Sequence, residues 1–131
     1  VDIVVVLQPT SPLRSTSDID KALEILLNKQ ADGVVSVCEC EHSPFWSNTL
    51  PSNGNMGQFI REEYDKRSQD LPTCYRLNGA IYIYTKKSLM HKGMMIDDSV
   101  FSYVMSNERS VDIDTLIDFR LAELILADKA L

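Results

Sequence analysis

The feature that most constrains the fold of this chain is its first apolar run, VDIVVVL, which leads directly into the segment Gln8 to Arg14. An unbroken β-branched run without polar alternation is typical of a strand buried on both faces, as in a parallel sheet covered by helices. In open α/β sheets, ligands bind beyond the carboxyl ends of such strands. The run begins at residue 1, and a central strand does not form the edge of a domain. We therefore expect the chain to be the later part of a longer protein.

Helix and strand patterns alternate along the rest of the chain. Apolar residues recur at helical spacing from about residue 16 to 30, and a second strand begins at Val34, which together predict a βαβ unit. Further patterns predict a strand over 79–84, a short helix over 86–91, a strand over 100–105 and an amphipathic helix over 115–131. With 131 residues, 44% of them hydrophobic, the chain can bury one modest core, so we expect a single α/β domain over 1–131.

Residues 41–76 break this alternation, because they hold prolines, glycines and a charged run but no sustained period. So long an irregular segment in a compact domain is usually functional or an interaction arm.

Charge and cysteine content exclude some classes of function. The formal net charge of −6 argues against non-specific nucleic-acid binding, but a few placed arginines can still hold a small anionic substrate. No apolar run is long enough for a membrane span, and no signal peptide is recognisable. Three cysteines without Cys-x-x-Cys spacing favour a reduced, intracellular setting. Cys38, Cys40 and His42 share one strand face, where buried thiols are favoured over a metal site.

The segment after the first strand holds the first candidate binding residues, Gln8, Thr10, Ser11 and Arg14. Amide and hydroxyl groups of this kind can hold a polyhydroxylated ligand, and a guanidinium suits a carboxylate or phosphate. A rigid Pro-x-x-Pro turn whose hydroxyls cap the next helix accounts for the same residues equally well.

The second candidate is the pair Asp112 and Asp114. Two carboxylates two residues apart can converge on one hard cation, and Mg²⁺ needs only one or two carboxylates beside substrate phosphates. The alternative is that Asp114 caps the final helix. A third segment, Asn78-Gly79 before an apolar strand, is by spacing alone an ordinary turn signal.

Three segments in order carry a resemblance to a known family: LQPTSPLR after the first strand, RSQDLPTCYRLNGAIYIY in mid-chain, and MSNERSVDIDTLIDF before the last helix. Over nearly the whole chain they resemble the acylneuraminate cytidylyltransferases, the CMP-N-acetylneuraminic acid synthetase family. The resemblance implies a partial nucleotide-diphospho-sugar transferase fold, which is Rossmann-like, with a mainly parallel sheet flanked by helices. It also implies transfer of CMP from CTP to N-acetylneuraminic acid or a related nonulosonic acid, with release of pyrophosphate and dependence on Mg²⁺ or Mn²⁺.

The same resemblance implies roles for single residues. Gln8, Thr10 and Ser11 match positions that line the sugar pocket, and Asp112 and Asp114 match the metal-binding, catalytic pair. Roles in activity or substrate binding are implied for three further positions, with Arg76 counted as catalytic: Gln69, Arg76 and Asn78. The irregular arm over 45–75 resembles the family's dimerisation insert, which implies a homodimer whose arm completes the partner's sugar site. A cytoplasmic location is implied, or a nuclear one in an animal.

The sequence also departs from the family pattern. The glycine- and basic-rich loop that cradles the triphosphate has no counterpart here, so the resemblance is to a C-terminal portion, and we expect the chain alone to be inactive. Where the family has Arg-Arg-Gln this chain has Arg67-Ser68-Gln69, and Met94-Met95 stands where some members have paired aromatics near the sugar. Two alternatives stay open: a cytidylyltransferase for legionaminic or pseudaminic acid, and a non-catalytic dimerisation or sugar-binding module.

Overall fold

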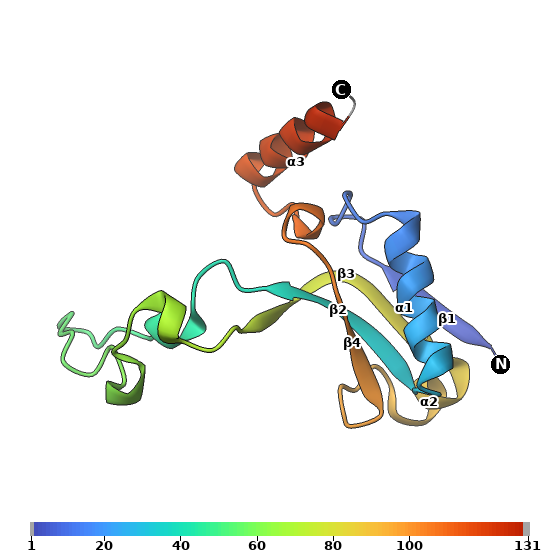
Figure 1. Cartoon of the computed structure of the whole chain (residues 1–131), viewed down its shortest axis with the longest axis horizontal. Coiled ribbons are helices and arrows are strands. Elements are labelled where there is room, and N and C mark those ends of the chain that lie inside the picture. Colours follow the sequence, from blue (N-terminus) through green and yellow to red (C-terminus); the bar gives the residue numbers. More distant parts are fainter. Residues whose placement is uncertain (1, 130–131) are drawn as a thin grey trace. The chain divides into compact units, whose positions relative to one another are not determined.

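The computed structural model describes residues 2–129, in which a mixed sheet of four strands is flanked by helices (Figure 1). The strands are β1 (Ile3–Leu7), β2 (Gly33–Glu39), β3 (Tyr75–Thr85) and β4 (Val100–Val104), in the spatial order β1-β3-β2-β4. The helices are α1 (Thr16–Asn28), α2 (Lys86–Lys92) and α3 (Leu116–Lys129). Single 3₁₀ turns are η1 (Pro44–Trp46), η2 (Glu62–Tyr64), η3 (Ser68–Asp70) and η4 (Glu108–Ser110). The α/β class is confirmed; residues 130 and 131 of the expected last helix lie outside the described residues.

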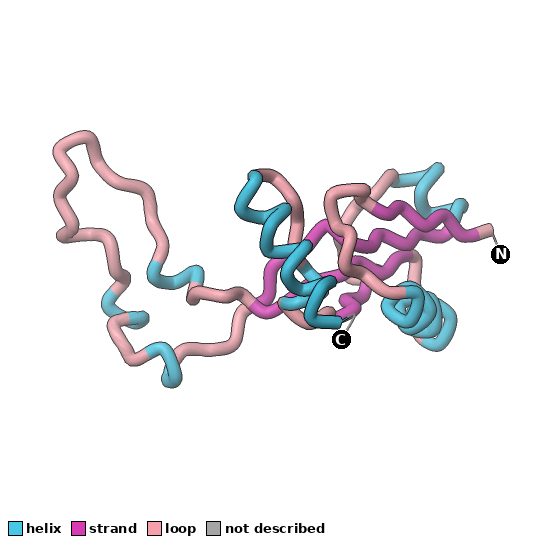
Figure 2. The backbone as a smooth tube through the Cα atoms, turned by 90° about the horizontal axis from the view of Figure 1, so that it is seen from above, coloured by secondary structure: helices cyan, strands magenta, loops and turns pink. Residues whose placement is uncertain are grey.

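The chain divides into two compact units. The first, here called the sheet unit, contains the described residues up to Cys38 and from Leu77 onward. The second, the arm unit, is Glu39–Arg76, and Figure 2 shows it as long loops joined by short helical turns. None of the residues 39–76 is buried, so the arm unit has no core of its own.

The first strand departs from its prediction, because β1 lies at the edge of the sheet and pairs antiparallel with β3. Its residues Val5 and Val6 are 38% and 39% exposed, not buried on both faces. A β-branched run favours extended backbone whether or not both faces are covered. The run therefore predicts the strand correctly and its burial wrongly.

The predicted mainly parallel sheet is mixed. Strands β2 and β4 run parallel, with Val34 opposite Phe101, whereas β1 and β3 run antiparallel. The strand–helix–strand order of β1, α1 and β2 is present, but β3 lies between the two strands.

The core of the sheet unit lies between α1 and the sheet. Helix α1 places Ala22 and Leu26 at its centre, as its 3.6-residue apolar spacing predicts. Strand residues meet this helix face and are almost fully buried: Val34 of β2, Ile81 and Ile83 of β3, and Tyr103 of β4. Because β3 and β4 both contribute, the core holds β3, whose Asn78 and Gly79 adjoin the candidate site, and β4, which leads into it.

Helix α3 is the second departure, because its apolar residues do not form one buried face. Ile117 and Leu124 are 79% and 61% exposed, and Ala122 is its one buried residue among those described. The apolar side chains are distributed around the helix axis, so the i, i+3, i+4 spacing read from the sequence selects only some of them.

Candidate functional site

Two of the predicted segments meet in the sheet unit. One is the Gln8–Arg14 loop after β1, and the other, here called the acidic segment, runs from Ser106 to Thr115 between β4 and α3. The backbone N–H of Ile113 donates a hydrogen bond of 2.8 Å to the carbonyl oxygen of Thr10. Because Ile113 stands between Asp112 and Asp114, this bond brings the acidic pair beside the hydroxyl-bearing loop.

The carboxylate of Asp114 does not cap helix α3. Thr115 and Asp118 form the cap: the Asp118 Oδ2 accepts from the Thr115 N–H at 2.9 Å, and the Thr115 Oγ1 accepts from the Asp118 N–H at 3.2 Å. The backbone N–H of Asp114 also donates to Asp118 Oδ2, and this bond contributes most to lowering the pKa of Asp118. The alternative prediction of a capping role for Asp114 is therefore wrong, and its side chain stays exposed.

The other carboxylate of the pair is held differently. The Oδ1 atom of Asp112 is buried and has no hydrogen-bond partner among the described residues. A buried carboxylate oxygen without a donor is costly unless a cation or another donor meets it. In residues 2–129 there is no group of three or more His, Cys, Asp or Glu suited to a metal, so the candidate here is a pair of carboxylates. That number suits Mg²⁺, which takes its other ligands from phosphates and water.

The Gln8–Arg14 loop is rigid and partly exposed. The Nη1 of Arg14 donates to the carbonyl oxygens of Gln8 at 2.6 Å and of Ala80 at 3.2 Å, so it closes the loop against β3. Ser11 is fully buried and its Oγ has no partner among the described residues, whereas Thr10 is exposed. Neither hydroxyl caps α1, because Ser15 does so. Arg14 therefore has a structural role in closing the loop, whereas the two hydroxyls have no capping role. The binding roles of the loop residues stay predictions.

Gly79 allows the side chain of Gln8 to approach the backbone of β3. Its φ is +72°, a conformation that glycine adopts without steric penalty, and a Cβ built there would lie 2.5 Å from Gln8 Oε1. Asn78-Gly79 thus lies inside β3 and is not a turn before it, which corrects the expected start of this strand.

Asn78 lies in the core with 3% of its surface exposed, and its amide is fully engaged. Its Oδ1 accepts from Ser36 Oγ at 2.6 Å, and its Nδ2 donates to Ser110 Oγ at 2.9 Å. Asn78 thereby joins β2 and β3 to the acidic segment. Because its side chain is buried and bonded to Ser36 and Ser110, Asn78 could affect a substrate only by holding these segments in place. Its predicted substrate role stays a prediction.

Two predicted residues, Gln69 and Arg76, belong to the arm unit. Gln69 is exposed in η3. The guanidinium of Arg76 makes a two-pronged contact with Glu41, with Nε–Oε2 and Nη2–Oε1 distances of 3.1 and 2.7 Å. These hydrogen bonds are the main reason why the pKa of Glu41 lies below its ordinary value. The catalytic role of Arg76 and the substrate role of Gln69 stay predictions.

Sequence reasoning missed Asp18 and Arg109. The Asp18 side chain is 2% exposed and accepts hydrogen bonds from Arg109, from the Tyr103 hydroxyl and from Ser15. Ser15-x-x-Asp18 has the spacing of a helix capping box, which is a readable signal. The partner Arg109 is 91 residues away, and nothing in the sequence pairs the two.

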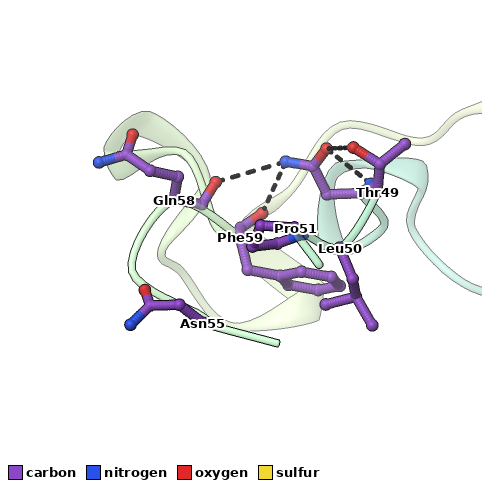
Figure 3. Close-up of a pocket in the computed structure, with 7 residues that line it drawn as sticks. Thr49, Leu50, Pro51, Asn55, Gln58 and Phe59 are labelled. Carbon is purple, nitrogen blue, oxygen red and sulfur yellow. Dashed lines mark hydrogen bonds between the residues drawn. The ribbon is translucent and has the colours of Figure 1, made fainter. Parts of the chain in front are cut away.

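The arm unit has a pocket of its own. It has a volume of about 320 Å³ and is lined by residues of 48–59, including Leu50, Asn55 and Phe59 (Figure 3). The Asn48 Nδ2 is engaged there by the carbonyl oxygens of Gln58 and Phe59, both at 3.3 Å. The pocket holds none of the predicted site residues.

Comparison with known proteins finds several relatives whose names refer to nonulosonic acids. It is 36% identical over 115 residues to the N-acylneuraminate cytidylyltransferase of Streptococcus agalactiae, which covers 88% of this chain and 28% of that protein. It is 32% identical to the CMP-N,N'-diacetyllegionaminic acid synthase of Legionella pneumophila (95% of the chain, 54% of that protein). It is 27% identical to the pseudaminic acid cytidylyltransferase of Campylobacter jejuni (95% and 53%).

These similarities confirm the resemblance drawn from the three motifs. The chain spans 28% to 54% of the length of these curated relatives. No family model matches the chain. Among the described residues, no helix has the length and apolarity needed to cross a membrane.

Proposed function

We propose that the native polypeptide containing this chain is a nonulosonic acid cytidylyltransferase, like the relatives to which the chain is similar. In the proposed reaction the anomeric hydroxyl of the sugar attacks the α-phosphorus of CTP, the new oxygen–phosphorus bond forms, and pyrophosphate leaves. The proposal names the sugar only by class, because relatives named for three different nonulosonic acids match the chain.

One observation carries the proposal: the hydrogen bond from Ile113 to Thr10 joins the acidic pair to the Gln8–Arg14 loop. Phosphoryl-group transfer depends mainly on positioning and on neutralising charge. A site for it needs carboxylates for a cation close to groups that hold the acceptor. The junction of these two segments provides both kinds of group.

Within this proposal Asp112 and Asp114 would hold a divalent cation, with Asp112 supplying the buried Oδ1 that has no partner among the described residues. When bound, Mg²⁺ supplies charge neutralisation at the phosphate oxygens. The exposed hydroxyl of Thr10 and the amide of Gln8, which Gly79 holds close to β3, would orient the acceptor sugar. The chain itself thus contributes cation binding and acceptor orientation.

We also propose that the arm over 45–75 mediates a homodimer. It is supported by the lack of any buried residue in the arm unit and by the exposure of its large apolar side chains, among them Leu50 (62%) and Met56 (57%). Such side chains are typical of a surface that is covered in an assembly.

The test is a pyrophosphate-release assay of the intact native polypeptide with CTP and a panel of N-acetylneuraminic, legionaminic and pseudaminic acids. We expect turnover with one member of the panel, dependent on added Mg²⁺ or Mn²⁺. Binding of a sugar without pyrophosphate release, by a correctly folded polypeptide, would instead support the non-catalytic alternative.

A further inference from the structure

The acidic segment has little regular structure that could hold its carboxylates in place. Between β4 and α3 it contains a single 3₁₀ turn, η4. Groups that share a cation must be fixed to within about 0.5 Å, by packing and hydrogen bonds from residues around them. The elements that fix Ser106–Thr115 therefore matter to any cation bound by the acidic pair.

Arg109 attaches this segment to the start of helix α1. Its Nε donates to Asp18 Oδ2 at 3.0 Å and its Nη2 donates to Asp18 Oδ1 at 3.1 Å, a two-pronged contact. The Asp18 side chain is 2% exposed and that of Arg109 is 33% exposed. Two parallel hydrogen bonds fix direction as well as distance, which a single contact does not.

The Asp18 carboxylate also has donors that do not belong to the acidic segment. The hydroxyl of Tyr103, on β4, donates to Oδ1 at 2.8 Å, and the backbone and hydroxyl of Ser15 donate to Oδ2 at 2.8 and 2.9 Å. Burial alone would raise the pKa of Asp18, but Arg109 and these donors together lower it to about 2. The carboxylate is thus charged at neutral pH, and Arg109 is the donor that connects it to the acidic segment.

Two attachments bracket Asp112. Arg109 stands three residues before it and Ile113, bound to Thr10, one residue after it. Both lead to the same part of the sheet unit, because Thr10 lies in the Gln8–Arg14 loop and Asp18 lies four residues after Arg14, in the first turn of α1. The position of the acidic pair relative to that loop therefore depends on both attachments, beside the Asn78–Ser110 hydrogen bond that joins the segment to β3.

We propose that Asp18 and Arg109 are positioning residues, which hold the acidic pair in register with the Gln8–Arg14 loop for cation binding. This inference rests on the proposed function, since it assumes that Asp112 and Asp114 bind the cation. It assigns a role to an ion pair that has a buried carboxylate and a part-exposed guanidinium and that is distinct from the proposed cation ligands.

The test measures binding of Mn²⁺ alone to the intact native polypeptide, by electron paramagnetic resonance of the free ion. The main variant is Arg109→Lys, which keeps the charge but cannot make the two-pronged contact. Ser15→Ala removes a different donor, the Ser15 hydroxyl, from the same carboxylate, and Ser15 lies at the start of α1, outside the acidic segment. Arg120→Lys, at an exposed position on α3, controls for an arginine-to-lysine exchange that does not involve Asp18, and Asp114→Asn tests the cation site itself.

We expect Arg109→Lys to weaken Mn²⁺ binding about tenfold, the lower end of the effect of residues that orient metal ligands. Ser15→Ala and Arg120→Lys should leave Mn²⁺ binding unchanged, even where Ser15→Ala lowers the melting temperature as much as Arg109→Lys does. Unchanged binding in Arg109→Lys, or equal weakening in Ser15→Ala, overturns the positioning role. Unchanged binding in Asp114→Asn overturns the cation assignment of the proposed function instead, so the two failures are distinguishable.

Should Arg109→Lys not fold, the variant Asp18→Asn gives the same test. It retains one oxygen acceptor, for either Tyr103 or Ser15, but removes the charge that orients Arg109. We expect the same weakening of Mn²⁺ binding, about tenfold, because loss of a residue that orients a metal ligand typically has an effect of this size. Wild-type Mn²⁺ affinity in a folded Asp18→Asn protein would contradict the proposal.

Discussion

Each of the two units contains a two-pronged arginine–carboxylate pair, and the surroundings of the two pairs differ. In the sheet unit, Arg109 meets Asp18, whose side chain is 2% exposed. In the arm unit, Arg76 meets Glu41, and these side chains are 39% and 48% exposed. The first pair joins segments that are 91 residues apart beside the packed core. The second joins the two ends of the arm unit, in which no residue is buried. The comparison teaches that the same contact can fix a site in one place and contribute little in another, because water competes for the exposed pair.

The largest expected effect is the loss of protein stability when each of these two pairs is broken. Arg109→Met should lower the free energy of unfolding by about 3 kcal/mol, because it leaves the Asp18 carboxylate buried without its cation. Arg76→Met should lower it by no more than about 1 kcal/mol, since both partners are exposed. Urea unfolding of the two variants measures the difference. Equal losses in the two variants would break the distinction between the units.

A smaller effect is expected from pH. The folded-state pKa of Asp18 is about 2, below its ordinary value of 3.8. Its stabilising contribution is therefore fully present above pH 4 and is lost as the pH falls toward 2. The loss amounts to about 2 kcal/mol.

Asp97 has a similarly low pKa of about 2, chiefly through its hydrogen bond from Lys92, and adds to the acid sensitivity of the wild type. Unfolding free energies of wild type and Asp18→Asn, followed from neutral pH down to about pH 2, separate the contribution of Asp18. The variant should have the shallower pH dependence. An identical slope for both proteins would mean that Asp18 is not held as described.

Two glycines with the same φ of +72° allow a finer comparison. Gly79→Ala and Gly54→Ala should each lose about 1–2 kcal/mol through backbone strain. Only at position 79 does the new Cβ meet a side chain, that of Gln8; around Gly54 nothing lies within 4 Å. Gly79→Ala should therefore also raise the KM for the nonulosonic acid in the pyrophosphate-release assay. An unchanged KM would indicate that Gln8 does not orient the acceptor.

The smallest effect on stability is expected at exposed leucines. Leu50→Ser in the arm unit and Leu27→Ser in the sheet unit, 62% and 61% exposed, should each change the free energy of unfolding by less than about 0.5 kcal/mol. If the arm mediates a homodimer, Leu50→Ser should shift the protein toward the monomer in sedimentation velocity, and Leu27→Ser should not. A wild-type protein that sediments as a monomer would remove the arm from the proposed assembly.

Local periodicity predicted many of the elements correctly. Helices α1 and α2 and strands β2 and β4 lie within a few residues of their expected ranges, because their apolar spacing matches how they pack. The burial of β1 was not predictable, since a β-branched run has the same backbone preference at an edge and at a centre. The single buried face expected for α3 failed because its apolar residues surround the helix.

The residue types of the candidate site were predictable from the sequence, but the contacts that fix its segments in place were not. Asp112, Asp114 and Thr10 came from motif and spacing, and the structure brings their segments together. The contact between Asp18 and Arg109 depends on tertiary packing across 91 residues, which spacing does not encode. Likewise, that Thr115 and Asp118 cap α3 in place of Asp114 is decided by local geometry among three acceptors of similar character.

The most direct test of the central claim compares turnover of two aspartate variants of the intact native polypeptide, at saturating CTP, sugar and Mg²⁺. Asp114→Asn should lose at least about 100-fold in kcat, because charge neutralisation by a bound metal is worth several kcal/mol. Asp118→Asn weakens the cap of α3 but removes no proposed cation ligand, so its kcat should stay within a few-fold of wild type. Equal kcat values for Asp114→Asn and wild type would contradict the assignment of this site to nucleotidyl transfer.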